Sequence, residues 1–140
     1  MPKKICCLLV VLIAAFACPV LASTYTEVQE AITPRFTHIM FVDSWLLISA
    51  MGEATCGGAA ILYTPTQSIE ITIELQRLEG SSWATVRTWT ATGPGLPGVE
   101  LERRHYVSSG VYRARTRARA FSSGGLLLEE ASTYSGITAY

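Results

Sequence analysis

The chain has 140 residues, a formal net charge of zero and a hydrophobic share of 49%. Without an excess of positive charge it has no global field that would drive nucleic-acid binding. It contains no asparagine, which excludes N-glycosylation and leaves its turns to glycine, serine and proline.

The N-terminal segment has the pattern of an export signal. Two lysines precede an apolar run at residues 5–16, Pro19 ends the run, and Val20-Leu21-Ala22 offers small residues at the spacing that a signal peptidase reads. The run is about 12 residues long, whereas a membrane-spanning helix needs roughly 20. We therefore expect a signal-peptide helix over residues 1–22, cleavage after Ala22 and a secreted protein.

A second processing site is possible within the same segment. Ala15-Phe16-Ala17-Cys18 resembles the cleavage site of a bacterial lipoprotein. Cleavage before Cys18 would produce a lipid-anchored protein in place of a freely secreted one. In either case, the mature form is expected to have no stable membrane span.

Removal of the signal changes the chemistry of what remains. Both lysines and three of the four cysteines are lost, so the mature chain has nine arginines against eleven acidic residues. Cys56 is then the single cysteine, which rules out an internal disulfide. Because its neighbours are small and apolar, Cys56 is expected to be buried.

The segments after the signal are read in chain order. Residues 23–35 form a polar lead-in, in which Pro34 stops any helical turn. Apolar and alternating stretches then predict strands at residues 36–40, 45–51, 54–63, 69–76, 83–91, 99–107, 111–121 and 126–133. Turn residues separate them every 8–12 residues, which is typical of a sandwich. We predict an all-β fold: one immunoglobulin-like antiparallel β-sandwich of seven or eight strands over residues 36–135, with a tail at residues 136–140.

An arginine row is the most unusual local feature. Its four members alternate with small residues and would share one face of a strand: Arg113, Arg115, Arg117 and Arg119. Such a row could bind a sulfated or phosphorylated polymer, because guanidinium groups bind these anions bidentately. The alternative, which we favour, is that carboxylates on neighbouring strands neutralise it. The expected acids are Glu70, Glu74, Glu129 and Glu130.

Aromatic residues supply a second candidate contact. Trp83 and Trp89 are an even number of residues apart, so both would project from the same face of the predicted strand. They could form a platform for a sugar ring or, as we favour, belong to the core. Trp45 lies in an apolar run and is expected in the core. Tyr112 begins the second-last strand, where sandwich domains often place a tyrosine whose hydroxyl caps a backbone loop.

Catalytic residues are sparse. His38, His105 and Asp43 could be drawn as a triad with a serine, but no Gly-x-Ser-x-Gly elbow is present. Glu100 and Glu102 could be drawn as a glycosidase pair, although alternating glutamates are ordinary on a wet strand. One cysteine and two distant histidines provide no metal-ligand spacing. We expect a protein that is not an enzyme and uses no cofactor.

The order of short motifs resembles a known family. The motifs are Ile32-Thr33-Pro34-Arg35-Phe36, Ala54-Thr55-Cys56, Gly80-Ser81-Ser82-Trp83, Tyr106-Val107-Ser108-Ser109-Gly110-Val111-Tyr112-Arg113 and Ser132-Thr133-Tyr134-Ser135. They are similar to an uncharacterised family of small secreted proteins from Gram-positive bacteria with an immunoglobulin- or fibronectin-like sandwich. The resemblance implies the fold and export, and it carries no activity.

These observations lead to two functional hypotheses from different classes. The first is a non-enzymatic extracellular sandwich that binds a protein or glycan partner at the cell surface. The second is a self-assembling module that pairs through the Leu126-Leu127-Leu128 run on the terminal strand. We expect a monomer or weak self-association, and a hydrolase is the remaining alternative.

Overall fold

The computed structural model describes residues 36–140; the predicted signal helix, the Ala22 cleavage site, Cys18 and the lead-in lie outside the described residues. Within this range the chain contains no helix and forms eight strands. They are β1 (Ile39–Ile48), β2 (Glu53–Leu62), β3 (Ser68–Glu79), β4 (Ser82–Pro94), β5 (Val99–Tyr106), β6 (Val111–Phe121), β7 (Leu127–Tyr134) and β8 (Thr138–Ala139).

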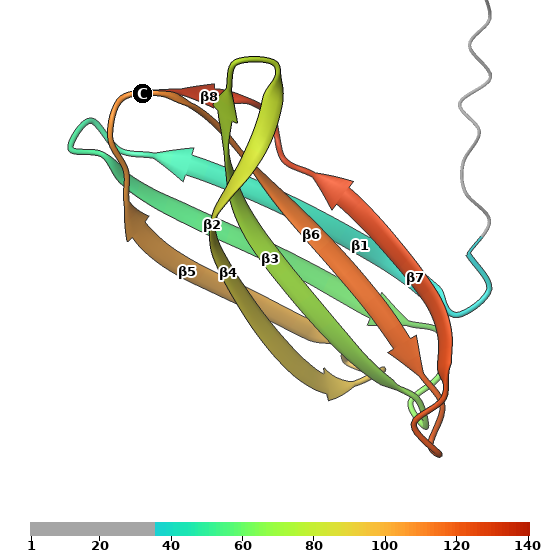
Figure 1. Cartoon of the computed structure of the whole chain (residues 1–140). Coiled ribbons are helices and arrows are strands. Elements are labelled where there is room, and N and C mark those ends of the chain that lie inside the picture. Colours follow the sequence, from blue (N-terminus) through green and yellow to red (C-terminus); the bar gives the residue numbers. More distant parts are fainter. Residues whose placement is uncertain (1–35) are drawn as a thin grey trace, which may run out of the picture. The chain divides into compact units, whose positions relative to one another are not determined.

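The strands form two antiparallel sheets. One sheet has the order β1-β2-β5, and the other has the order β4-β3-β6-β7, with β8 paired to β6. The two sheets lie as separate layers (Figure 1), and the chain passes between them after β2, β4 and β5. This is the predicted immunoglobulin-like β-sandwich, with the fourth strand paired to the third.

The core follows from period-two alternation on the two central strands of the larger sheet. Ile69, Ile71, Ile73 and Leu75 of β3 are fully buried, and their neighbours on β6 are small. Ile71 lies opposite Ala118 and Leu75 opposite Ala114. Large residues on one strand therefore fill the space that small residues on the next strand leave, which permits dense packing against the facing sheet.

Two glycines on β2 let other side chains approach the strand from both sides. A Cβ at Gly57 would overlap the indole of Trp45, and a Cβ at Gly58 would overlap Thr116. Thr116 is buried and its hydroxyl donates to Ser44 Oγ at 3.0 Å, which joins the two sheets through a hydrogen bond in the core. Gly57 thus leaves space for Trp45 on the outer face of β2, and Gly58 leaves space for Thr116 on its core-facing side.

Two expected boundaries were wrong. The first two predicted strands are one strand, β1, which continues through the polar residues between them. Asp43 projects outward opposite Ala59, and the buried Ser44 hydroxyl accepts a hydrogen bond from Thr116. The predicted tail at residues 136–140 contains β8, and Gly110 and Tyr140 exchange two backbone hydrogen bonds of 2.9 Å. The last residues therefore belong to the sheet.

Candidate functional site

The four arginines lie on the outer face of β6, as the alternation predicts. Every second residue of β6 is buried, and the arginines between them are half-buried. Their partners on β3 are Gln76 opposite Arg113, Glu74 opposite Arg115, Thr72 opposite Arg117 and Glu70 opposite Arg119. We call the outer surface formed by these eight residues, with Glu130, Ser132 and Tyr134 of β7, the arginine face.

Two of the arginines are paired with carboxylates. Arg119 Nη1 lies 3.1 Å from Glu70 Oε1, and its Nε lies 3.5 Å from Glu130 Oε2, without hydrogen-bond geometry in the second contact. Arg115 Nη1 lies 3.7 Å from Glu74 Oε2. These half-exposed pairs each contribute at most about 1 kcal/mol to stability, but they neutralise much of the row.

Glu129 does not join the arginine face, although the sequence suggested that it would. It pairs with Ala120, whose methyl faces the core, whereas Glu130 pairs with Arg119 on the outer face. Consecutive strand residues point to opposite sides of a sheet. The Glu129 carboxylate instead accepts hydrogen bonds of 2.7–2.8 Å from the backbone N–H groups of residues 37–39.

Arg113 is held by aromatic rings. Its guanidinium carbon lies 4.2 Å from the ring centroid of Trp83 and 4.1 Å from that of Tyr134, and its Nε donates to Gln76 Oε1 at 2.8 Å. Gln76 is only 6% exposed and donates in turn to Glu74 at 3.0 Å. The stack therefore links β4, β3, β6 and β7, and the guanidinium group occupies one face of the Trp83 ring.

The two β4 tryptophans lie on opposite faces of the sheet. Trp89 pairs with Ile73 and packs against the core, whereas Trp83 pairs with Leu78 on the outer face. The cause is the register shift between Leu75 and Gln76, where an extra β4 residue, Val86, reverses the parity of the strand. The expectation of a shared face was therefore wrong.

Trp45 also differs from its prediction. Its neighbours Ser44 and Leu46 are buried, and Trp45 itself lies half-buried on the outer face of β1, against Gly57. Its Nε1 donates to Glu102 Oε2 at 3.4 Å. Trp45 is therefore not a core residue. It lies on the side of β1 that faces away from the core, where Gly57 has no side chain and leaves space for the indole.

Arg117 is the exception within the row. Within residues 36–140 it makes neither a salt bridge nor a contact with an aromatic ring, whereas each of the other three arginines makes at least one of these. Its Nε is buried without a hydrogen-bond partner, as are those of Arg115 and Arg119. Its cross-strand neighbours are the neutral Thr72 and Ser132, and Ser132 Oγ accepts from Arg115 at 3.3 Å. The face thus has four guanidinium groups and three carboxylates. Arg113 and Arg117 contact no carboxylate, and of these two only Arg117 also lacks an aromatic partner.

Two residues have clear structural roles. Tyr112 is 2% exposed, and its hydroxyl donates to the backbone oxygen of Ser108 at 2.7 Å, which confirms the predicted cap. Cys56 is fully buried as predicted, and burial raises the pKa of its thiol to about 12. Neither residue is available to a ligand.

The residues that could be drawn as a triad are not assembled. Asp43 of β1 lies opposite Ala59 of β2, on the outer face of the smaller sheet. His105 of β5 lies opposite Ala54 of β2, on the core-facing side of that sheet. The His38 ring hydrogen-bonds the Gln67 side chain at 3.0 Å. Across the described part of the chain, no three His, Cys, Asp or Glu side chains form a group that could hold a metal ion.

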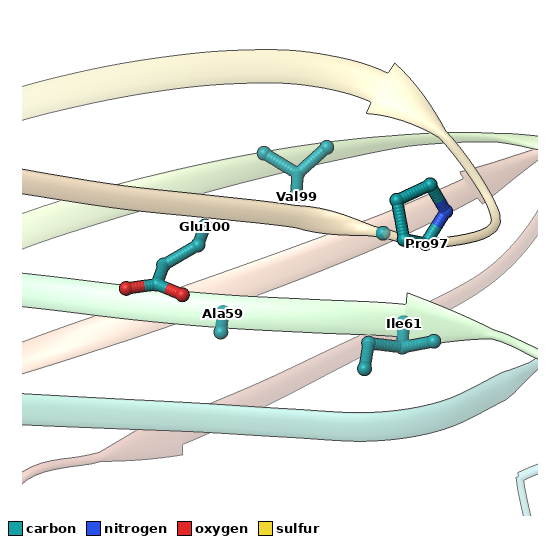
Figure 2. A pocket seen from close by; sticks show the side chains of 6 residues that line it. Ala59, Ile61, Pro97, Val99 and Glu100 are labelled. Atoms are coloured by element: carbon teal, nitrogen blue, oxygen red, sulfur yellow. The ribbon is translucent and has the colours of Figure 1, made fainter.

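A shallow hollow lies on the other sheet, with a volume of about 270 Å³. It is lined by Ala59, Ile61, Pro97, Gly98, Val99 and Glu100. Figure 2 shows Ala59 and Ile61 on β2 beside Val99 and Pro97, with the carboxylate of Glu100 at one side. The mainly apolar lining and single carboxylate provide no pair of acids across a cleft, as a glycosidase would need.

The leucine run before and within β7 is partly exposed, and its strand edge is occupied nearby. Leu126 is 69% and Leu127 43% exposed. Two residues further on, the Glu129 side chain holds the backbone of residues 37–39 against the strand. Pairing of another chain with the leucine run stays a prediction.

No protein-family model and no curated protein matches the sequence. Residues 36–140 also include no helix of the length and apolar character needed to span a bilayer. The sequence did not predict the interaction of Arg113 with Trp83, Gln76 and Tyr134. Gln76 does alternate in step with Glu70 and Glu74, and Tyr134 in step with Glu130, which places both on the arginine face.

Proposed function

We propose that this protein is a secreted, non-enzymatic β-sandwich that binds an anionic glycan or protein at the cell surface through the arginine face. The observation that carries the proposal is Arg117, a guanidinium without a carboxylate partner at the centre of a face whose other arginines are engaged. A sulfate, phosphate or carboxylate group would supply the missing charge. Arginine binds such groups through two parallel hydrogen bonds.

The surroundings of Arg117 favour a polymer over a small ion. Arg115 and Arg119 flank it at about 6.8 Å along the strand, and their carboxylate contacts of 3.1–3.7 Å are solvent-accessible enough to rearrange. The hydroxyls of Thr72 and Ser132 lie on neighbouring strands at the same level. A chain with repeated anionic groups would therefore find donors on both sides of Arg117.

The experiment measures retention of residues 23–140 on immobilised heparin during a salt gradient. This fragment retains the whole unit of residues 34–140, which forms its own compact core. We expect Arg117→Gln to elute at clearly lower salt than the wild-type protein, and Arg117→Glu at lower salt still, because the attraction is electrostatic.

The matched control is Arg104→Gln, which makes the same charge change on β5. Arg104 lies on the other sheet, where its exposed side chain contacts Glu53 at 3.5 Å. We expect it to shift elution little. An equal shift for Arg104→Gln and Arg117→Gln would show that retention follows net charge alone, and no shift for Arg117→Glu would refute the proposal.

A further inference from the structure

Besides the two-residue strand β8, the two sheets have four edge strands, and three of these four carry features that oppose pairing with another strand. β5 has Glu100, Glu102, Arg103 and Arg104 among its eight residues. β7 has two adjacent glutamates and is held to residues 37–39 by one of them. β1 has a central aspartate and an irregular register near its start. Charges, irregularities and covering segments are the usual protection of edges.

β4 differs from these three strands in its second half, because its own bulge and its charge both lie in the first half. It is the longest strand, with 13 residues, and lies at the end of its sheet away from β7 (Figure 1). Its single charge, Arg87, sits next to the bulge at Val86, and residues 88–94 are uncharged. Threonine, tryptophan and alanine in this stretch favour extended backbone. Thr88, Thr90 and Thr92 are exposed on its outer face.

The sequence of this stretch is self-complementary. If two copies pair antiparallel about Thr90, then Thr88 lies opposite Thr92, and Trp89 lies opposite Ala91 on the core-facing side. Arg87 would lie opposite Gly93, which has no side chain to oppose it. Each pair joins two residues on the same face of the sheet, and no pair places two charged residues opposite each other. We propose that the protein forms a two-fold homodimer through the β4 edges.

The dimer would extend the binding surface beyond that of one chain. A two-fold axis perpendicular to the sheet keeps both outer faces on the same side, so the two arginine faces would lie on one continuous sheet. Five strand spacings separate one β6 from the other, which is about 24 Å. At this distance the two rows repel little at physiological salt, and one long anionic polymer could contact both.

The first experiment measures the mass of residues 23–140 by sedimentation equilibrium over a range of concentrations. We expect a dimer for the wild-type protein. In the double variant Thr88→Lys, Thr92→Lys, each lysine at position 88 lies opposite the lysine at position 92 of the other copy. The two like-charged pairs should raise the dimer Kd about tenfold or more. Thr88→Lys with Thr92→Glu places opposite charges there and should retain the dimer.

Thr85→Lys is the matched control. Thr85 is an exposed outer-face residue of the same strand but lies beyond the bulge, outside the paired stretch, so its substitution should leave the Kd unchanged. Thermal unfolding of each variant verifies that the fold persists. A monomer at every concentration, or a dimer that the double lysine variant does not weaken, would overturn the proposal.

A cross-link tests the register directly. Thr90→Cys places two cysteines opposite each other at the two-fold axis, where the Cα separation of about 4.5–5.5 Å suits a disulfide. Mild oxidation should produce a covalent dimer, whereas Thr85→Cys should remain monomeric on a non-reducing gel. Equal cross-linking of both variants would argue against the β4 register. The heparin test of Arg117 compares substitutions outside β4, so failure of the dimer leaves that test intact.

Discussion

At the scale of single residues, burial and strand parity decide which charged or reactive groups reach solvent. Glu129 and Glu130 are chemically identical neighbours, yet one binds three backbone N–H groups and the other faces Arg119. Only one of them therefore reaches the arginine face. Arg117 lies between the neutral Thr72 and Ser132, so the register of β3 and β7 leaves it without a carboxylate.

Cys56 shows the effect of burial on a reactive group. Burial raises the pKa of its thiol to about 12, and the thiolate is the form that attacks disulfide reagents. We expect native protein at pH 8 to react with Ellman's reagent far more slowly than protein in denaturant. Equal rates under the two conditions would show that the thiol is exposed in solution.

At the scale of elements, side-chain contacts across strands hold the arginine face in position. The stack of Trp83, Arg113 and Tyr134 joins β4, β6 and β7 over the buried Gln76. It forms only because the bulge at Val86 brings Trp83 to the outer face while Trp89 stays with the core. The register of β4 therefore determines which tryptophan meets an arginine.

A double-mutant cycle measures this stack. We expect Trp83→Leu and Arg113→Gln to show a coupling of about 0.5–1 kcal/mol in the free energy of unfolding, the usual range for a solvent-accessible cation–π contact. The same cycle with Trp89→Leu should show no coupling, since Trp89 lies on the opposite face. Similar coupling in both cycles would contradict the assignment of faces. Chemical denaturation of the four proteins in each cycle supplies the data.

At the scale of the whole molecule, a few polar contacts join the two sheets in addition to apolar packing. Thr116 donates to Ser44 within the core, and Glu129 of one sheet binds the backbone that leads into β1 of the other. Burial alone would raise the pKa of Glu129. The three N–H hydrogen bonds, with a smaller contribution from His38, outweigh that effect and hold the pKa below its ordinary value.

This lowered pKa makes the contribution of Glu129 dependent on pH. A carboxyl group with a depressed pKa in the folded state stabilises fully above its unfolded pKa, and the contribution is lost as pH falls through the folded pKa. We expect Glu129→Gln to reduce the free energy of unfolding at pH 7 by about 1 kcal/mol, after allowance for solvent screening. The difference from wild type should narrow below about pH 4.5.

Urea denaturation at pH 7 and at pH 3 measures both effects. Glu130→Gln is the control, because its exposed ion pair with Arg119 should change stability by less than about 0.5 kcal/mol. A stability difference between wild type and Glu129→Gln that stays constant with pH would contradict the role of the charged carboxylate.

The sequence by itself determined the features that depend on local alternation. The period-two pattern of residues 69–76 and 111–121 predicted the core faces of β3 and β6, the outward arginine row and the burial of Tyr112. Glycine- and serine-rich turns predicted most strand boundaries. These features follow from neighbouring residues, because side chains on a strand alternate whatever the strand pairs with.

Only the tertiary structure decided how the strands meet. It joined two predicted strands through Asp43, placed Trp45 over Gly57, and used Val86 to separate the faces of Trp83 and Trp89. It also decided which acids reach the arginines and which edge of the sheet remains unprotected. These outcomes depend on register, bulges and contacts between residues far apart in the chain, and no local pattern specifies them.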